Sequence, residues 1–297
     1  MLLNPYRFGI VAGSKALFGY GTTGTNVSLT NLVSDTGVVA TDTAGVGTAR
    51  YGLAASRYGT DKALFGYGYT GAGVSMTNLV SNAGAVASDT TGVGTARYWL
   101  AAAKYSTDKA IFGYGSAPAV VGLTNLVSNA GVVATDVVAV GVGRTYTAAA
   151  AYGTDKAIFG FGVITAGSAY VSTTNLVSNT GVVGVDTAGV GTIRGYLAAT
   201  GYGTDKAIFG YGYTGAFVSM TNLVGNTGVM VTDTTGVGTV RLGLAAAGYG
   251  ADKALFGYGQ APANVSMTNL VSNTGVVATD TTGVGTGRYG LAASSYG

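Results

Sequence analysis

The 297-residue sequence contains no cysteine, no histidine and no glutamate, and its single glutamine is Gln260. Without cysteine and histidine, the chain lacks the usual ligands of zinc, copper and iron sites. Nucleophiles activated by histidine are excluded for the same reason. Helices use glutamate, lysine, glutamine and leucine on their surfaces, and the sequence is poor in this set. We therefore expect neither a helical protein nor an enzyme with a metal or other cofactor.

Charge is also scarce, because charged residues make up 9% of the chain and the formal net charge is only +3. A charge this small and this evenly spread argues against a nucleic-acid partner. Glycine, serine or threonine interrupts every apolar run well before the length of about 18 residues that a membrane-spanning helix needs. Residues 1–8 also lack the long apolar core of a secretory signal. We expect no membrane insertion.

The abundant residues are organised in a repeat. The motif Lys-Ala-(Leu/Ile)-Phe-Gly occurs six times, and an arginine recurs at the same period of 47 residues, with one interval of 50. The motif lysines are Lys15, Lys62, Lys109, Lys156, Lys206 and Lys253, and the arginines are Arg50, Arg97, Arg144, Arg194, Arg241 and Arg288. The three additional residues of the long interval lie within residues 163–170. A repeat of this length indicates one structural unit per copy.

Each repeat has room for four short strands. In the copy that starts at Arg194, we expect strands over residues 196–202, 206–212, 218–224 and 229–233, since valine, threonine and aromatic residues favour strands. Gly225-Asn226-Thr227-Gly228 is typical of a hairpin turn. Four strands per repeat is the content of one propeller blade.

The sequence therefore predicts an all-β fold, a six-bladed β-propeller with four antiparallel strands per blade. The last copy, residues 288–297, has a first strand but no second strand after it, whereas residues 15–42 lack a first strand. We expect 288–297 to join the blade formed by 15–42 and close the ring, which removes free edges. Residues 14–297 would then form one domain. Residues 1–13 would form an N-terminal arm lying on a face or on a neighbouring subunit, so a homo-oligomer stays open.

The pattern resembles the kelch repeat. Arg50, the strand through Ala54 and the segment 63–68 (Ala-Leu-Phe-Gly-Tyr-Gly) stand where kelch repeats have an arginine, a short strand and a strand that ends in a glycine pair. Here a tyrosine or phenylalanine separates the two glycines, and the outer-strand tryptophan is missing. The opening residues 3–8 and the low-charge repeats rich in glycine, threonine and alanine also resemble tail-fibre and other virion proteins of bacteriophages. These resemblances imply a propeller fold and a place in a virus particle.

Almost every charge belongs to the repeat, as Asp61, Lys62, Asp89 and Arg97 illustrate. A group present six times is a poor candidate for a unique acid or base. We therefore interpret these residues as a structural framework and predict no catalytic residue. Asp35 replaces an asparagine found in other copies and is interpreted as a turn residue. The loop 280–285 leaves open one calcium ligand per blade.

The copies differ most in the loop between the second and third strands. Six such loops should gather on one face of the ring, where rigid scaffolds usually carry binding residues. We predict Tyr69, Tyr170, Tyr213 and Phe217 as contact residues, because aromatic side chains bury large area at low entropic cost. Neutral variation at exposed loop tips is the alternative. The only tryptophan, Trp99, replaces the small glycine found in other copies, and we interpret it as packing in the first strand, with a contact role as the alternative.

Three functions follow from these observations. The first is a non-enzymatic structural or interaction protein of a phage virion, such as a tail, fibre or capsid-associated protein, with other virion proteins or a host surface as partners. The second is a propeller lectin or adhesin that binds a host-surface glycan. The third is a propeller enzyme, and the missing glutamate, histidine and cysteine argue against it. The first function predicts that the protein is located in the virion.

Overall fold

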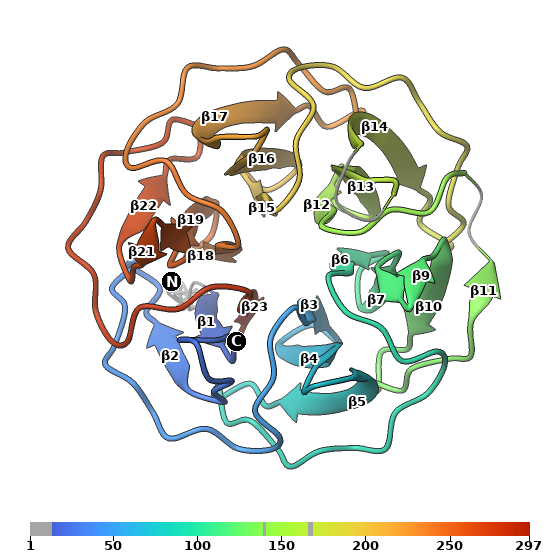
Figure 1. Ribbon diagram of the computed structural model, residues 1–297, viewed down its shortest axis with the longest axis vertical. Helices are drawn as coiled ribbons and strands as arrows, with labels where there is room; N and C mark the ends of the chain where they lie inside the picture. Colours follow the sequence, from blue (N-terminus) through green and yellow to red (C-terminus); the bar gives the residue numbers. More distant parts are fainter. Residues whose placement is uncertain (1–13, 139–140, 166–168) are drawn as a thin grey trace, which may run out of the picture.

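The computed structural model describes residues 14–138, 141–165 and 169–297, and this part of the chain contains strands, turns and connections but no helix. Six antiparallel sheets stand side by side in a ring around a central axis (Figure 1). The predicted all-β fold is confirmed. In the residues described, no helix is long and apolar enough to cross a membrane. The expected arm, residues 1–13, lies outside the described residues.

Each sheet begins with a five-residue strand at the axis and continues outward. From the axis outward, the sheets contain β3 (Ala54–Tyr58), β4 (Lys62–Tyr69) and β5 (Gly73–Val80); β6 (Ala101–Tyr105), β7 (Lys109–Gly113), β10 (Leu123–Val127) and β11 (Val137–Val138); β12 (Ala148–Tyr152), β13 (Lys156–Val163) and β14 (Tyr170–Val177); β15 (Ala198–Tyr202), β16 (Lys206–Tyr213) and β17 (Phe217–Val224); β18 (Ala245–Tyr249), β19 (Lys253–Gly257) and β22 (Thr268–Val271); and β23 (Ala292–Tyr296), β1 (Lys15–Gly19) and β2 (Thr30–Val33). Two short ribbons pair β8 (Ser116–Ala117) with β9 (Ala119–Val120) and β20 (Gln260–Ala261) with β21 (Ala263–Asn264).

The ring closes through strands that are far apart in the sequence. β23 pairs antiparallel with β1, with Lys15 opposite Tyr296. This register equals that of β3 and β4, where Lys62 lies opposite Tyr58. The expected pairing of residues 288–297 with the sheet formed by residues 15–42 is confirmed. Each innermost strand contacts the innermost strands of both neighbouring sheets, and these contacts run around the whole circle.

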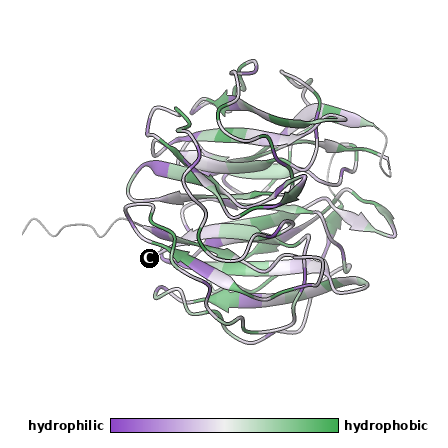
Figure 2. Ribbon diagram, turned by 60° about the vertical axis from the view of Figure 1, so that its left-hand side comes forward, coloured by the Kyte–Doolittle hydropathy of each residue, from purple (hydrophilic) through white to green (hydrophobic). Residues whose placement is uncertain are grey.

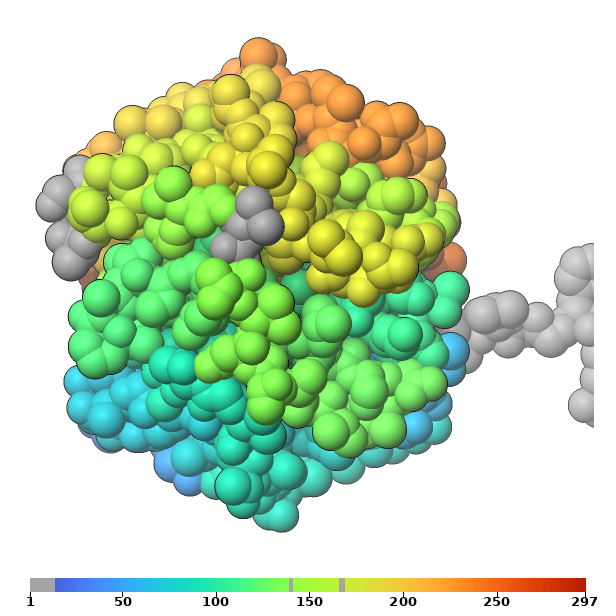
Figure 3. Space-filling view, turned by 90° about the vertical axis from the view of Figure 1, so that its right-hand side faces the viewer, coloured from blue at the N-terminus to red at the C-terminus, as the bar shows by residue number. Residues whose placement is uncertain are grey.

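The apolar core lies between neighbouring sheets, and the repeated motif explains their close contact. Phe65 and Phe112 are fully buried, and a methyl group on Gly66 would lie only 2.6 Å from the ring of Phe112 in the next sheet. The glycine of each motif thus leaves room for the phenylalanine of the following sheet. Side views show neighbouring sheets in contact along the rim (Figure 3) and hydrophobic residues dominating the strands (Figure 2).

The tyrosine between the two glycines has a structural reason. Tyr67 has a φ of 63°, and the register of β4 and β5 shifts between Gly66 and Gly68 at this position. The resulting bulge turns the buried Tyr67 ring toward the next sheet, where the guanidinium carbon of Arg97 lies 4.3 Å from the ring centroid. The Tyr67 hydroxyl donates a hydrogen bond to the carbonyl of Val93 over 3.1 Å. This residue therefore joins two sheets.

The expected fourth strand is reduced to isolated bridges such as Val80 with Val86 and Thr77 with Thr90, and only one sheet has a fourth strand, the two-residue β11 just beyond the expected segment. A side chain interrupts the ladder between these bridges. The amide nitrogen of Asn78, on the preceding strand, donates to the carbonyl of Ala87 over 3.0 Å. That carbonyl is thereby satisfied without a backbone partner, and Asn125 makes the same bond to Ala134 in the sheet of β11, whose outer pairing lies beyond it at Val137 and Val138. The prediction of four full strands per sheet was wrong for the five sheets that have three strands.

Candidate functional site

The two residues that follow each buried arginine bring the chain to the axis. The second of them has a positive φ in all six copies, between 52° at Trp99 and 63° at Gly290. The innermost strand therefore starts later than expected, at Ala198 rather than Tyr196, because a strand excludes this conformation.

These six residues form a closed circle of backbone hydrogen bonds. Each N–H donates to the carbonyl of the equivalent residue in the adjacent copy, over 2.6 to 3.1 Å. The members of this axial hydrogen-bond ring are Gly52, Trp99, Tyr146, Tyr196, Gly243 and Gly290. The ring fixes six chain segments close around the axis at one end of the molecule.

Aromatic side chains cover this end of the axis. The rings of Tyr146 and Tyr196 stack with centroids 3.7 Å apart, and the Trp99 ring lies 5.0 Å from Tyr146. Trp99 also extends across the axis, because a methyl group on Gly290 would lie 2.9 Å from its ring. Tyr51 packs edge-on against Trp99 at 5.5 Å. We call Tyr51, Trp99, Tyr146, Tyr196 and Tyr289 the aromatic cap.

Three of the cap residues occupy backbone positions that glycine would fill without strain. Trp99, Tyr146 and Tyr196 have φ values of 52°, 54° and 59°, and the equivalent residues of the other three copies are glycines. A residue with a side chain in this region costs about 1–3 kcal/mol, and such strain concentrates at functional sites. The hydrogen-bond ring needs only backbone atoms, so its geometry does not explain the aromatic side chains.

The loops between the second and third strands surround the cap. The residue after each arginine bridges to the beginning of such a loop, as Tyr51 does with Tyr69 and Gly195 with Tyr213. Predicted residue Tyr69 lies 5.5 Å from Tyr51 and 4.9 Å from Tyr98 between ring centroids. It thus extends the cap outward along one side.

The other three predicted residues form a second aromatic group. The ring centroids of Tyr170 and Tyr213 are 6.2 Å apart, and those of Tyr213 and Phe217 are 5.7 Å apart. A methyl group on Gly195 would lie 3.4 Å from both Tyr170 and Tyr146, so the second group adjoins the cap. The cap together with Tyr69, Tyr98, Tyr170, Tyr213 and Phe217 is named the aromatic face.

Sequence reasoning missed the centre of this face. Tyr51, Tyr98, Tyr146, Tyr196 and Tyr289 were not among the predicted contact residues, and for Trp99 packing was preferred over a contact role. The available signal was the variation at the two positions after each arginine, which are filled by aromatic residues in some copies and by glycine, threonine or leucine in others. That signal was overlooked because these residues stand beside a constant motif rather than in a loop of variable length.

The aromatic face is built from tyrosine, tryptophan and phenylalanine side chains alone. Burial raises the pKa of Tyr51, and the neighbouring hydroxyls of Tyr289 and Tyr69 raise it further. Burial is also the main cause of the raised pKa of Tyr196, followed by its contact with the hydroxyl of Tyr146. These hydroxyls stay protonated and can both donate and accept hydrogen bonds. The half-buried rings therefore offer apolar faces edged by hydroxyl groups.

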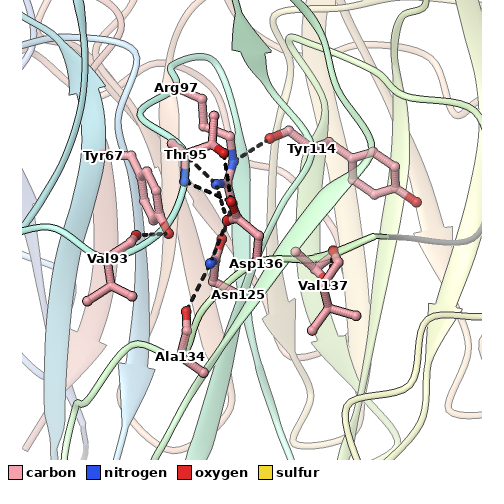
Figure 4. A network of polar contacts seen from close by, with 10 residues as sticks. Tyr67, Val93, Thr95, Arg97, Tyr114, Asn125, Ala134, Asp136 and Val137 are labelled. Carbon is pink, nitrogen blue, oxygen red and sulfur yellow. Dashed lines mark hydrogen bonds and ion pairs between the residues drawn. The ribbon is translucent and has the colours of Figure 1, made fainter.

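The predicted framework residue Arg97 lies below this face, fully buried in a polar network (Figure 4). Its guanidinium donates to the carbonyls of Tyr114 and Thr95 over 2.9 and 3.1 Å and to the side-chain oxygen of Asn125. It lies 3.6 Å from the carboxylate of Asp136. The same Asp136 accepts hydrogen bonds from the backbone and hydroxyl of Thr95. The network thus anchors the connection that enters each sheet.

The other framework residues belong to two different contacts. Asp89 lies 3.8 Å from Arg50, the arginine of its own sheet, rather than contacting Arg97. Asp61 and Lys62 stand at the opposite end of the molecule, where they form an exposed pair 3.8 Å apart. Asp61 also accepts a hydrogen bond of 3.1 Å from Asn82.

The irregular acid Asp35 occupies the turn position that Asn82 has in the next sheet, while Ser14 stands where that sheet has Asp61. In the sheet of β3 to β5 the acid is Asp61 and its neutral partner is Asn82. In the sheet of β1, β2 and β23 the acid stands at the turn position, as Asp35, and the neutral residue is Ser14. The carboxylate of Asp280, in the loop considered for calcium, accepts hydrogen bonds from Thr239 and Asn269. In residues 14–138, 141–165 and 169–297, no three acidic side chains come together as a metal site would require.

Comparison with models of known protein families gives no match, and no curated protein sequence is significantly similar to this chain. The functional argument therefore depends on the geometry of the aromatic face.

Proposed function

We propose that the chain is a six-bladed, kelch-like β-propeller that serves as a non-enzymatic binding module, with the aromatic face as its contact surface. The observation that carries this proposal is the strained backbone of Trp99, Tyr146 and Tyr196 at positions where other copies have glycine. The cost of that strain is offset by a benefit that the fold itself does not require. Half-exposed tyrosine and tryptophan are also the residues that dominate binding energy at protein interfaces.

The propeller assignment is supported by six sheets around one axis, by their continuous circle of contacts and by the pairing of β23 with β1. The non-enzymatic role is supported by the carboxylates. Those beside the buried arginines, such as Asp89 and Asp136, are held by hydrogen bonds inside a sixfold repeat. The set recurs in all six copies, and the one copy that departs from it has Val142 in place of the threonine that bonds the carboxylate elsewhere.

We further propose that the module is a component of a phage virion, where it binds other virion proteins or the host surface. The low charge, the rigid repeated sheets and the resemblance of residues 3–8 to virion proteins support this placement. Gold-labelled antibodies against the chain, applied to purified virus particles from the source culture, test it in the electron microscope. Labelling at a fixed place on each particle is expected, and unlabelled particles would overturn the placement.

A second candidate function is glycan binding, which the hydroxyl-edged rings of the cap favour. Tyrosine and tryptophan rings can stack on the apolar face of a sugar while the hydroxyls of tyrosine bond to its polar edge. Trp99 is the only tryptophan of the chain, so its fluorescence reports directly on the cap. A glycan selected on an array should change this fluorescence in a saturable manner.

The variant that tests this site is Tyr196→Gly. It keeps Trp99 as a reporter and introduces the glycine that two other copies have at this position, Gly243 and Gly290. We expect it to fold and to lose glycan binding. Array signals that do not change Trp99 fluorescence, or that survive in Tyr196→Gly, would exclude the aromatic face as the glycan site.

A further inference from the structure

A cavity lies on the axis toward the end opposite the aromatic cap. It has a volume of about 160 Å³ and is lined by small residues from all six innermost strands, such as Ala150, Thr200 and Ser294. A second hollow of about 170 Å³ lies toward the turns beside β12, β15 and β18. Spaces of this size hold several water molecules or one small solute.

Two long basic side chains line the first cavity. Arg57 on β3 and Lys104 on β6 occupy equivalent positions in adjacent sheets, one residue before the buried tyrosine that ends each strand. The other four sheets have Ala151, Gly201, Gly248 and Ser295 at this position. These four residues are small. Lys104 also lines the second hollow, together with three of the four, Ala151, Gly201 and Gly248.

Arg57 and Lys104 are the charges that the repeat does not explain. The chain has 15 basic and 12 acidic residues, and the framework uses one lysine and one arginine in each of six copies. Of the three remaining basic residues, Arg7 lies outside the described residues, and the other two are Arg57 and Lys104. Among the described residues, the basic side chains in excess of the acidic ones are therefore Arg57 and Lys104, which line the same cavity at equivalent strand positions.

The surroundings of these side chains favour an anion. Burial lowers the pKa of Lys104, the nearby Arg57 lowers it further, and Asp108 opposes the shift. Burial likewise lowers the pKa of Arg57, against the effect of Asp61. Arg57 donates to the backbone carbonyls of Thr60 and Gly297. Lys104 has no ion-pair partner within 4.0 Å in the part of the chain described.

The far end of the axis is closed by the hydrogen-bond ring and the cap above it. Under the cap, a ring of five leucines and Thr147 borders a separate space of only about 70 Å³. An anion beside Lys104 would thus lie in a cavity whose inner end is apolar, and two positive charges attract it more strongly there than on an open surface. Both cations suit oxyanions, because arginine and lysine are the usual phosphate-binding side chains.

We propose that this axial cavity binds a small oxyanion, phosphate or sulfate, between Lys104 and Arg57, either free or as the terminal group of a larger molecule. The site lies at the end of the axis opposite the aromatic face and does not depend on the proposed function of that face. Four small residues at the same level provide the space, and the two basic residues provide the charge.

Calorimetric titration of the full chain with inorganic phosphate tests the site, with sulfate in parallel and chloride at equal ionic strength as the reference. Lys104→Ala and Arg57→Ser introduce the residues that the chain itself has at Ala151 and Ser295, so both variants should fold. We expect saturable, one-to-one phosphate binding that weakens by at least about tenfold in each variant.

Lys62→Ala removes an exposed lysine at the start of β4 that does not line either space, and the variant should bind phosphate as the wild type does. Glucose 6-phosphate distinguishes the two sources of the anion. Tighter binding than phosphate, lost in the Lys104 and Arg57 variants, would support a larger ligand. Phosphate binding no stronger than that of chloride, or equal binding by Lys104→Ala and wild type, would overturn the proposal.

Discussion

At the scale of single residues, the repeated arginines show how a buried charge is accommodated. Arg50 is fully buried, yet its guanidinium donates to the carbonyls of Tyr67 and Thr48 and to the side-chain oxygen of Asn78. A buried charge without such partners would cost several kcal/mol. The sequence predicted that arginine and aspartate form a framework. It could not show that Asp89 pairs with Arg50, because this pairing depends on which segments enter the same sheet.

Replacing Arg97 by lysine should be strongly destabilising. Lysine has no planar fork to bond Tyr114, Thr95 and Asn125 together, so buried acceptors lose their donors. We expect the free energy of unfolding, measured by urea denaturation, to fall by about 3 kcal/mol. The exposed Lys62→Ala variant serves as control and should change it by less than about 0.5 kcal/mol. Similar values for both variants would contradict a framework role for Arg97.

The aspartates of the framework should make stability depend on acidic pH. Burial alone would raise the pKa of Asp89, but hydrogen bonds from Thr48 and Asn78 and the charge of Arg50 outweigh burial and lower it. The equivalent residues behave alike and are Asp42, Asp136, Asp186, Asp233 and Asp280. A lowered pKa in the folded state stabilises the fold above the pKa of the unfolded chain, about 3.9. This stabilisation is lost as the pH falls through the lower, folded-state value.

We therefore expect the free energy of unfolding to decrease steadily as the pH is lowered below about 4. Asp89→Asn removes one of these six contributions, so the slope against pH should be shallower than that of the wild type. Urea denaturation at a series of pH values measures both slopes. An unchanged slope in Asp89→Asn would show that this carboxylate does not contribute.

At the scale of elements, the turns and first three strands of each repeat were predictable, but the outermost strand was not. Strand-forming residues, glycine-rich turns and a fixed period located β15, β16 and β17 to within two residues of the expected bounds. The outermost segment has strand-forming residues too. Its ladder of backbone hydrogen bonds is interrupted where the side-chain amide of Asn222 donates to the carbonyl of Val231. The strand propensity of the outermost segment gives no information about this side chain, because Asn222 lies on the neighbouring strand.

The glycine of each outer turn packs against the adjacent sheet, which makes it more sensitive than an ordinary turn glycine. Gly131 has a φ of 80°, and a methyl group there would lie 2.8 Å from the Tyr58 ring. Gly71 has a φ of 120°, but nothing lies within 4 Å of the same position. Gly131→Ala should therefore be more destabilising than Gly71→Ala by about 1–3 kcal/mol, the usual cost of overpacking. Thermal unfolding of both variants checks this, and equal losses would contradict the packing role.

At the scale of the whole molecule, ring closure could be derived from the sequence because the copies are nearly identical. The missing first strand before residue 15 and the unmatched strand at 288–297 complement each other. The aromatic face could be derived only in part. Its centre consists of residues far apart in sequence that the ring brings together, and single-sequence patterns do not reveal how six chain segments converge on an axis.

Connecting the paired ends should convert the closing pair into an ordinary hairpin. β3 and β4 are joined by Gly59-Thr60-Asp61. In the closing pair, Gly297 stands at the position of Gly59 and Ser14 at that of Asp61, so only a residue equivalent to Thr60 is missing between them. A circular permutant that links Gly297 to Ser14 through one threonine, with new ends between Gly71 and Ala72, should unfold cooperatively like the parent. Deleting residues 288–297 should abolish this transition, because apolar residues such as Leu17 lose their cover. Circular dichroism during heating compares the variants, and a deletion variant that unfolds like the parent would contradict closure by β23.

The pairing of β1 with β23 also determines when the ring can form during synthesis. Lys15 is synthesised about 280 residues before its partner Tyr296, with every intervening sheet in between, and at typical translation rates this takes tens of seconds. During that interval β1 and β2 lack the innermost strand of their sheet, and β1 presents an unpaired edge. The nascent chain is therefore an open row of sheets whose first member is exposed to mispairing with other chains. Chaperone protection of β1 would matter most in this period and would become unnecessary once residues 288–297 dock.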